Sequence, residues 1–422
     1  MKPLGKDGVW RLRNVTVPGC LVGKDDDLVV TDITIDGDRF SDRGGKDIEM
    51  NRSIILPCFV DMHTHIDKGH IWPRASNTDG SFMGALTTVG ADRSANWSAD
   101  DVRTRMEFSL KCAYAHGTRA IRTHIDSLAP QDEISWPVFA EMRDKWKGRI
   151  DLQASSLVGC DSYDNLAEGY ADTADIVAAA GGVLGVVTYP VPDVKDRLID
   201  FLNLANDRDL EIDFHADETM DPSSETLRLI AETVLETGWE LPVTVGHCCS
   251  LSTQDDARAM ETLDLVAKAG INIVSLPMCN LYLQDRHPNR TPRNRGITLV
   301  HEMVERGINV SFASDNTRDP FYAYGDLDML EVLRQATRIG HLDHSRLDWP
   351  NTVLGNPARA CGFTEPSFKP GAPADFVVFN ARTWTELFAR PQSDRMVFRA
   401  GEEIDTTLPD YSELDHLMEK SS

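Results

Sequence analysis

The sequence lacks any apolar stretch long enough to cross a membrane. A membrane-spanning helix needs about 20 apolar residues, whereas the longest apolar runs here have the length of a β-strand. The first residues, Met-Lys-Pro-Leu-Gly-Lys, also lack the apolar centre of a signal peptide. We therefore expect no membrane partner and a cytoplasmic protein.

Basic residues are scarce. The chain has 43 Lys and Arg against 67 Asp and Glu, a formal net charge of −24 at pH 7. Nucleic acids and anionic lipid surfaces select basic faces, so this charge argues against both as partners. The acidic residues are spread along the chain without forming a tail, which is typical of a solubilising surface and disfavours a large acidic substrate.

Paired metal-binding or redox cysteines are also absent. None of the eight cysteines forms a Cys-x-x-Cys pair, and most lie in apolar segments, which indicates buried reduced thiols. Cys248 and Cys249 directly follow His247, so they belong either to the core or to the wall of a site. No glycine-rich dinucleotide fingerprint, P-loop or internal repeat is found.

The middle of the chain alternates between strand-like and helical segments. Apolar strand-like runs lie at 54–62, 119–125, 150–157, 182–188, 210–215, 242–247, 271–276 and 308–314. Helical stretches of suitable length separate them. Eight such units predict an α/β protein, a (β/α)8 TIM-like barrel rather than an open doubly wound sheet.

Both ends of the chain are rich in strands. Strand patterns cover 9–16 and 27–35 near the start and 374–379 and 395–401 near the end, with turn residues between them. We expect residues 1–56 and 366–422 to form one small β-sandwich domain. The barrel domain is then expected over residues 57–365.

Two histidines follow the first barrel strand. In Phe59-Val60-Asp61-Met62-His63-Thr64-His65, the two imidazoles stand at positions i and i+2. Such residues project from the same face of a strand. Both rings can therefore reach one ion.

Further polar side chains lie at the ends of other predicted strands. They are His124 and Asp126 on the second, His215 on the fifth, His247 on the sixth and Asp315 on the eighth. Catalytic groups of a barrel lie at the carboxyl ends of its strands. Imidazoles with one carboxylate suit one divalent transition metal ion, Zn²⁺ or Fe²⁺, better than Ca²⁺ or Mg²⁺. His124 either forms hydrogen bonds inside the barrel or borders a substrate pocket.

Glu218 is the candidate proton carrier. It lies three residues after His215, whereas Asp217 points away if the segment stays extended. A metal ion lowers the pKa of its bound water to near 7, and a nearby acid must then move protons. Hydrolysis of a C–N bond fits this set, with Glu218 donating to the ring or leaving group and Asp315 taking the proton from water. The alternative is that Glu218 is a solvated loop acid.

At these residues the chain resembles the amidohydrolase superfamily, and within it the cytosine deaminase group, over nearly its whole length. The matching segments are 57–68, 122–126, 215–218, 280–286, 295–298, 314–316 and 319–320. The resemblance implies one iron or zinc ion bound by His63, His65, His215 and Asp315. It also implies that His247 polarises the attacking water, that Glu218 protonates a ring nitrogen and that Gln284 lies near the substrate. Family members are often homo-oligomers.

The departures from the family pattern concern the metal count and the substrate. No lysine ends the fourth strand, 183–189, so a bridging carboxylated lysine is absent and one metal ion is expected. The loop 155–161 has Gly159 and no glutamine where cytosine deaminases read the pyrimidine edge. Asn316 and Phe321 replace an acid and a tryptophan, and Asp315-Asn316 also resembles triazine N-alkyl amidohydrolases. We expect substrate contacts at Gln284, Asn316, Phe321, His124 and Gly159.

Three functions follow from these observations. The first is a metal-dependent hydrolytic deaminase that releases ammonia from a small nitrogen heterocycle, such as a cytosine-like pyrimidine. The second is an enzyme that releases an N-alkyl amine from a triazine-like ring or hydrolyses a cyclic amide. The third, a binding protein without activity, is disfavoured because Glu218, His247 and Asp315 are all present.

Overall fold

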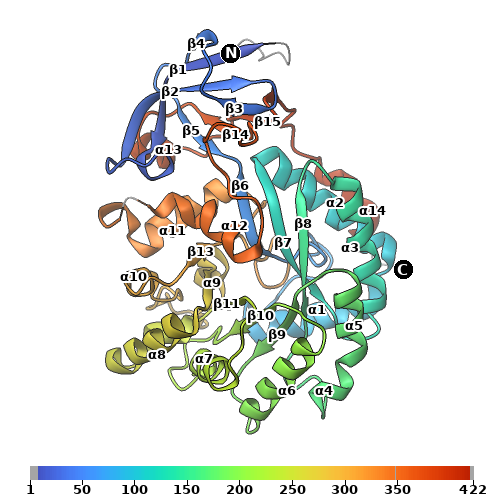
Figure 1. Ribbon diagram of the computed structural model, residues 1–422. Helices are drawn as coiled ribbons and strands as arrows, with labels where there is room; N and C mark the ends of the chain where they lie inside the picture. The colour runs from blue at the N-terminus through green and yellow to red at the C-terminus, as the bar shows by residue number, and fades with distance from the viewer. Residues whose placement is uncertain (1–7, 347, 419–422) are drawn as a thin grey trace.

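Eight parallel strands form the centre of the larger body of the protein (Figure 1). The computed structural model describes residues 8–346 and 348–418. One sheet has the order β6-β7-β8 and the other β13-β12-β11-β10-β9. The strands are β6 Phe59–Thr64, β7 Thr118–Asp126, β8 Asp151–Leu157, β9 Leu184–Thr188, β10 Ile212–Ala216, β11 Val243–His247, β12 Asn272–Ser275 and β13 Val310–Phe312.

The order of the strands agrees with a barrel, but the two sheets do not close through continuous ladders. Isolated parallel bridges connect β8 to β9 at Ser155–Val183 and Gly159–Val187. A single bridge, Thr64–Asp315, connects β6 to the segment after β13. The expectation of a (β/α)8 barrel is therefore met in part, as an α/β body of eight parallel strands with two weakly bonded seams.

Helices cover the outside of these strands (Figure 1). The longer ones are α1 Phe82–Asn96, α2 Ala99–His116, α3 Asp132–Trp146, α5 Ala171–Ala179, α6 Val194–Asn206, α7 Thr226–Thr237, α8 Asp256–Ala269 and α11 Met329–Gly340. The shorter ones are α4 Leu166–Gly169, α9 Pro277–Leu283, α10 Val300–Glu305, α12 Gly355–Cys361, α13 Trp384–Ala389 and α14 Asp415–Met418. Because helices cover the sheet, all nine residues of β7 are buried.

Helix α2 shows how the sequence sets the limits of these elements. The Ser98 side chain accepts a hydrogen bond from the Asp101 backbone N–H at the start of α2. At its end Gly117 has φ 95°, a left-handed conformation that glycine adopts without a steric penalty. Both are residue types that favour these positions, serine at the start of a helix and glycine after its end.

The two ends of the chain form one sheet, not the expected sandwich of two. Its strands are β1 Val9–Pro18, β2 Leu28–Asp36, β3 Arg39–Ser41, β4 Lys46–Glu49, β5 Ile54–Pro57, β14 Phe376–Phe379, β15 Met396–Arg399 and β16 Glu402–Glu403. The order is β16-β15-β14-β5-β1-β2-β3, with β4 beside β1. Strand β5 pairs with β1 on one side and with β14 on the other, so the backbone hydrogen bonds continue from one chain end to the other.

The run 54–62, expected as one barrel strand, is in fact two strands. Its first part, β5, belongs to the sheet of the chain ends, and its second part, β6, begins the barrel. Between them the Cys58 N–H donates to the Asp375 carbonyl oxygen at 3.0 Å. Both strands are buried throughout, so the apolar pattern continues from one to the other and does not show where the first strand ends.

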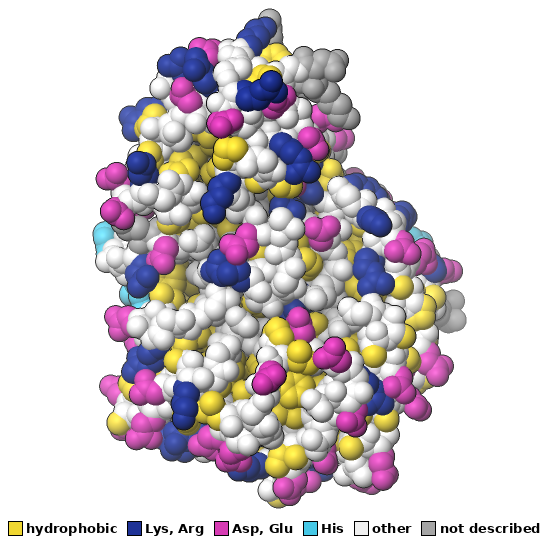
Figure 2. Space-filling view, in the orientation of Figure 1, with side chains coloured by type: hydrophobic (Ala, Val, Ile, Leu, Met, Phe, Trp, Pro, Cys, Tyr) yellow, Lys and Arg dark blue, Asp and Glu magenta, His cyan; other side chains and the backbone are white. Residues whose placement is uncertain are grey.

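The surface carries charges of both signs. Figure 2 shows Lys and Arg interspersed with Asp and Glu on the face presented there. Within the described residues, no helix combines the length and the apolar character needed to cross a membrane.

Candidate active site

His63 and His65 lie at the carboxyl end of β6 and face Asp315. The Nε2 atoms of His63 and His65 lie 3.7 Å and 3.1 Å from Oδ1 of Asp315. The Asp315 backbone N–H donates to the His63 carbonyl oxygen at 2.9 Å, which fixes the aspartate beside the strand. Asp315 has φ 64°, so the chain turns sharply after β13 and directs the carboxylate toward the two imidazoles.

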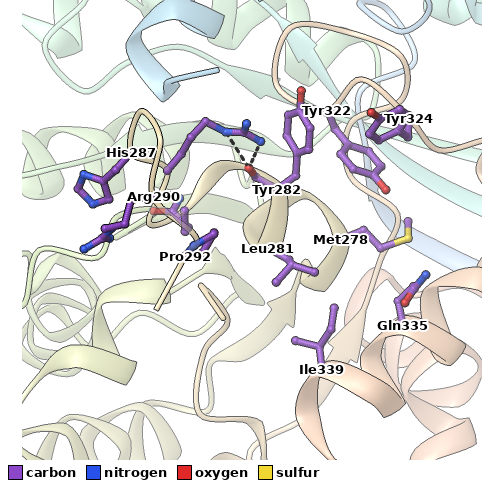
Figure 3. Close-up of a pocket in the computed structure, with 12 residues that line it drawn as sticks. Met278, Leu281, Tyr282, His287, Arg290, Pro292, Tyr322, Tyr324, Gln335 and Ile339 are labelled. Atoms are coloured by element: carbon purple, nitrogen blue, oxygen red, sulfur yellow. Dashed lines mark hydrogen bonds between the residues drawn. The ribbon is translucent and has the colours of Figure 1, made fainter. Parts of the chain in front are cut away.

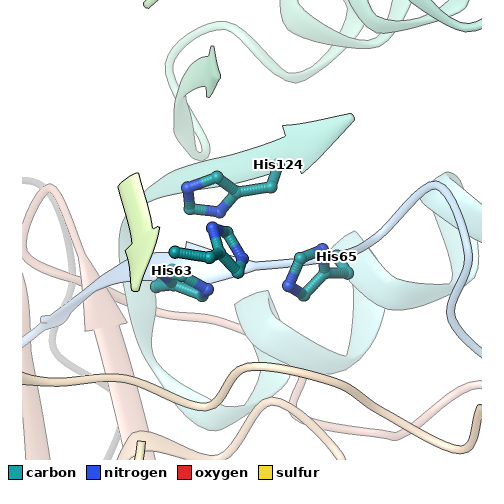
Figure 4. A group of neighbouring side chains, drawn as sticks. His63, His65 and His124 are labelled. Carbon is teal, nitrogen blue, oxygen red and sulfur yellow. The ribbon is translucent and has the colours of Figure 1, made fainter. Parts of the chain in front are cut away.

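Five imidazoles from four strands converge on this point. The rings of His63 and His124 lie 4.0 Å apart, and those of His63 and His215 lie 4.4 Å apart. One ring nitrogen from each of His63, His65, His124 and His215 lies within 4.8 Å of the others (Figure 4). His63, His247 and Asp315 form a second such group. We call these six residues the histidine cluster.

The cluster has the properties of a cation site. Both ring nitrogens of His63, His124 and His215 are buried without a hydrogen-bond partner in the described part of the chain, as are both carboxylate oxygens of Asp315. Buried polar atoms without partners are costly, so their concentration at one point indicates a missing ligand. Nitrogen donors with one carboxylate suit a divalent transition metal ion, Zn²⁺ or Fe²⁺. The residues present therefore fit one such ion.

The protonation of the cluster also suits metal binding. Burial, followed by the neighbouring imidazoles, lowers the pKa of His63 and His215 well below the ordinary value. Burial lowers the pKa of His247 to about 3. The rings are therefore neutral at pH 7, which is the form that binds a metal ion.

His124 lies inside the cluster, nearer to its centre than the sequence indicated. Its Nε2 atom also lies 3.3 Å from Oδ1 of Asp213 on β10. Asp213 is fully buried and interacts on its other side with the guanidinium of Arg122, at 3.3 Å. His124 is not among the residues that line the cavity described below, and its contact with a substrate stays a prediction.

Glu218, His247 and Asn280 form a connected group beside the cluster. Oε1 of Glu218 lies 3.4 Å from Nδ1 of His247. The Asn280 amide donates to Oε1 of Glu218 at 3.2 Å and lies 3.1 Å from Nδ1 of His247. If Nδ1 accepts this hydrogen bond, the ring proton of His247 resides on Nε2. Sequence analysis placed Asn280 in the family-like segment 280–286 but gave it no role, because it has no strand-end pattern.

The environment of Glu218 favours its protonated form. Burial, and then the negative charge of Asp315, raise the pKa of Glu218 well above its ordinary value. A carboxyl group of this kind can both hold and release a proton near neutral pH. Asp217 faces the other way, as predicted, and its carboxylate accepts hydrogen bonds from the Thr226 and Leu227 backbone N–H groups.

A cavity of about 360 Å³ opens in front of the cluster. His65, His215, His247, Glu218 and Asp315 line its inner end. Its walls are largely apolar and include Phe82, Leu86, Val89, Leu157 and Phe321. The rings of Phe82 and Phe321 meet edge to face with centroids 5.5 Å apart.

Three of the five predicted substrate contacts line this cavity: Gly159, Asn316 and Phe321. Gln284 does not. Its amide donates to the Glu218 carbonyl oxygen at 3.1 Å, so it holds the backbone of Glu218 in place. The Gln284 side chain lines a neighbouring pocket of about 420 Å³, whose walls include Tyr282, Tyr322 and Tyr324 (Figure 3).

Three charged residues lie in the cavity wall. Asp126 was expected at the end of the second strand but without a role, and Lys68 and Arg93 were not predicted as site residues. Nζ of Lys68 lies 3.0 Å from Oδ1 of Asp126, and Nη1 of Arg93 lies 3.1 Å from Oδ2 of the same carboxylate. Asp126 follows His124 by two residues on β7, so the strand period places both on one face. That spacing is the signal in the sequence for a role of Asp126 in the site. Arg93 lies on α1, which the sequence pattern did not indicate.

Comparison with known proteins places the chain among enzymes of C–N bond chemistry. The Amidohydrolase family matches residues 165–404. A pterin deaminase of Rhizobium rhizogenes is 55% identical over 368 residues, which cover 87% of this chain and 84% of that one. An N-isopropylammelide isopropyl amidohydrolase of a Pseudomonas species is 23% identical over 373 residues, 83% of this chain and 88% of that one.

The fold has a counterpart among solved structures. A 5-methylcytosine deaminase of Klebsiella pneumoniae, liganded with phosphonocytosine, superimposes with a TM-score of 0.79 at 24% identity. The match covers 93% of this chain and 97% of that chain.

Proposed function

The chain belongs to the amidohydrolase family, and on that premise we propose that it is a metal-dependent hydrolytic deaminase of a pterin-like ring. The observation that carries the proposal is the position of Glu218. A buried carboxyl group of raised pKa lies 3.4 Å from His247, at the inner end of a cavity that also reaches the histidine cluster. A binding protein has no use for such a proton carrier.

The residues of the site have distinct tasks in this proposal. His63, His65, His215 and Asp315 hold one divalent metal ion, which when bound makes a water molecule nucleophilic at neutral pH. His247 directs its Nε2 proton toward that water. Asp315, beside His65 at 3.1 Å, accepts a proton from the water.

Glu218 carries the second proton transfer. In its protonated form it donates to the ring nitrogen next to the carbon that bears the amino group, which makes that carbon more electrophilic. After the attack the Glu218 carboxylate takes the proton of the new hydroxyl group and passes it to the amino group, which leaves as ammonia as the carbonyl group forms. The proton held by Asp315 then restores the protonated form of Glu218. Asn280 keeps Glu218 and His247 in register, and Gln284 holds the Glu218 backbone.

A fused two-ring substrate is supported by the cavity and by the relatives. About 360 Å³ lies within the range of small-molecule sites. Phe82 and Phe321 offer aromatic surface to a flat ring. The relative at 55% identity is a pterin deaminase, whereas a cytosine-like substrate has no comparable support. The relative that releases an N-alkyl amine is 23% identical, which is weaker support.

The test is an ammonia assay on the metal-loaded enzyme with pterin, isocytosine, cytosine and N-isopropylammelide. We expect ammonia and lumazine to appear in equal amounts from pterin, with kcat/KM at least tenfold above that of each other compound. No ammonia from pterin, or a higher kcat/KM for cytosine, would contradict the proposal. Metal analysis of the same sample ensures that a negative result does not reflect an empty site.

A further inference from the structure

A buried group of three charges lies in the cavity wall, apart from the histidine cluster. The Asp126 carboxylate interacts with Lys68 through one oxygen and with Arg93 through the other. The side chains of Lys68 and Asp126 are only 5% and 8% exposed. All three residues line the cavity that also reaches Glu218.

This group has hydrogen-bonding capacity that the protein does not use. An ammonium group has three N–H donors. In the part of the chain that the structure describes, Nζ of Lys68 donates only to Asp126. Each carboxylate oxygen of Asp126 has two lone pairs, and each accepts from one side chain. A buried charge is stable only when it is well paired, so the free donors of Lys68 indicate a polar partner in the cavity.

The neighbouring ring restricts where that partner lies. Nζ of Lys68 is 5.3 Å from the centroid of the Phe321 ring, which lines the same cavity. The ammonium group stands over one face of Phe321, so a flat ring that lies beside it on that face meets Lys68 with its edge. The loop at Gly159 supplies no amide side chain for this purpose.

We propose that Lys68 and Asp126 form a lactam-reading subsite, in which Lys68 donates to a ring carbonyl oxygen and Asp126 accepts the adjacent ring N–H. A lactam edge places an acceptor next to a donor, and the Lys68–Asp126 pair places a donor next to an acceptor at 3.0 Å. Arg93 is a positioning residue that holds the second oxygen of Asp126. The inference rests on the proposed deaminase function and identifies which edge of the heterocycle the enzyme selects.

The competing explanation is structural. In that case the ion pair of Lys68 with Asp126 serves only to hold the loop after β6 against the end of β7. A structural role predicts equal losses with every substrate. A reading role predicts a loss confined to substrates that have the carbonyl group.

The experiment compares pterin with 2-aminopteridine, which has the same rings and amino group but no carbonyl oxygen. In the wild type we expect a higher kcat/KM for pterin. In Lys68→Met we expect kcat/KM to fall about 10- to 100-fold for pterin, the usual range for a hydrogen bond to a charged group, and less than threefold for 2-aminopteridine. Lys68→Gln, which retains N–H donors but loses the positive charge, should lie between the two. An equal fall with both substrates at unchanged metal content would overturn the subsite.

Lys145→Met is the matched control. Lys145 is 45% exposed and pairs with Glu107 at 2.7 Å, away from the cavity lining. Its removal should change neither substrate by more than twofold.

A binding experiment separates this inference from the proposed function. Lumazine has the lactam edge but no amino group, so its binding requires no turnover. We expect its Kd, measured by fluorescence titration, to rise at least tenfold in Lys68→Met. If the wild type releases no ammonia from pterin but this rise is observed, the proposed function fails and the subsite stands. An unchanged Kd overturns the subsite.

Discussion

The carboxylate of Glu218 and the imidazole of His247 approach each other to 3.4 Å, and one side-chain amide, that of Asn280, contacts both. The two residues come from the ends of adjacent strands, β10 and β11, which pair in parallel. The register of that pairing, with Ala216 opposite His247, therefore sets the distance between proton carrier and imidazole.

Replacing Glu218 should stop chemistry without disturbing the fold. We expect Glu218→Gln to lower kcat about 10²- to 10⁴-fold, the usual contribution of a general acid–base. Ammonia release, thermal unfolding and metal content are the measurements. Glu225→Gln, which removes the partner of Arg258 at 2.6 Å, is the control and should retain full activity. A kcat for Glu218→Gln within threefold of the wild type would exclude it as the proton carrier.

Removal of the metal ion should be reversible, and adding the ion back should stabilise the folded protein. Chelation should abolish ammonia release, and one equivalent of Zn²⁺ or Fe²⁺ should restore it and raise the Tm, because an ion that binds only the folded state stabilises it. His65→Ala and Asp315→Asn should each lower the bound metal content below half. The control is His287→Ala, whose side chain is 55% exposed. Full metal content in both cluster variants would mean that the ion binds elsewhere.

The aromatic wall should act on substrate affinity. Phe321→Ala removes a ring that meets Phe82 at 5.5 Å and lies under Lys68. We expect KM for pterin to rise about two- to tenfold, the worth of one aromatic contact, with a smaller effect on kcat. Phe388→Ala, which removes a ring stacked on Trp384 in α13, should leave KM unchanged. A fall in kcat alone would place Phe321 in the chemical step instead.

His70 should make the stability of the fold depend on pH. Burial lowers the pKa of His70 to about 3, while the unfolded chain titrates near 6.5. Between these values the unfolded state binds more protons, so stability rises with pH in this window and falls on acidification. The contribution is at most about 1.4 kcal/mol per pH unit.

The measurement is urea unfolding of wild type and His70→Asn from pH 7 to pH 5. Asparagine tolerates the left-handed conformation, φ 66°, that this position has. The variant should lose less stability than the wild type on acidification. Parallel pH curves would show that His70 is not the titrating group.

The convergence of the histidine cluster was predictable from the sequence because strand period and strand ends are local signals. His63, His65, His215, His247 and Asp315 each follow an apolar run, and parallel strands bring such positions to one rim. The wall of the cavity was not predictable in the same way. Phe82 and Arg93 lie on α1, which has a weak apolar periodicity and is positioned by tertiary contacts, such as the ion pair of Arg74 with Asp92 at 2.9 Å.

Gln284 shows a second limit of sequence reasoning. The sequence pattern predicted that Gln284 contacts the substrate, whereas in the structure its side chain holds the backbone of Glu218. Only the hydrogen bond to Glu218 distinguishes these two roles. The single sheet of the chain ends, where a sandwich was expected, was not predicted for a related reason. Strand patterns reveal which segments are extended, whereas the choice between one sheet and two depends on pairing partners far apart in sequence.

The continuous sheet of the two chain ends has a consequence for biosynthesis. Strand β5, which leads directly into the metal-binding end of β6, finds its partner β14 only at Phe376–Phe379. A ribosome adding roughly 5–20 residues per second needs tens of seconds to pass from one strand to the other. During that time the nascent chain exposes an unpaired strand edge next to the first two histidines. The sheet that precedes β6 is therefore completed only after all six residues of the histidine cluster have been synthesised.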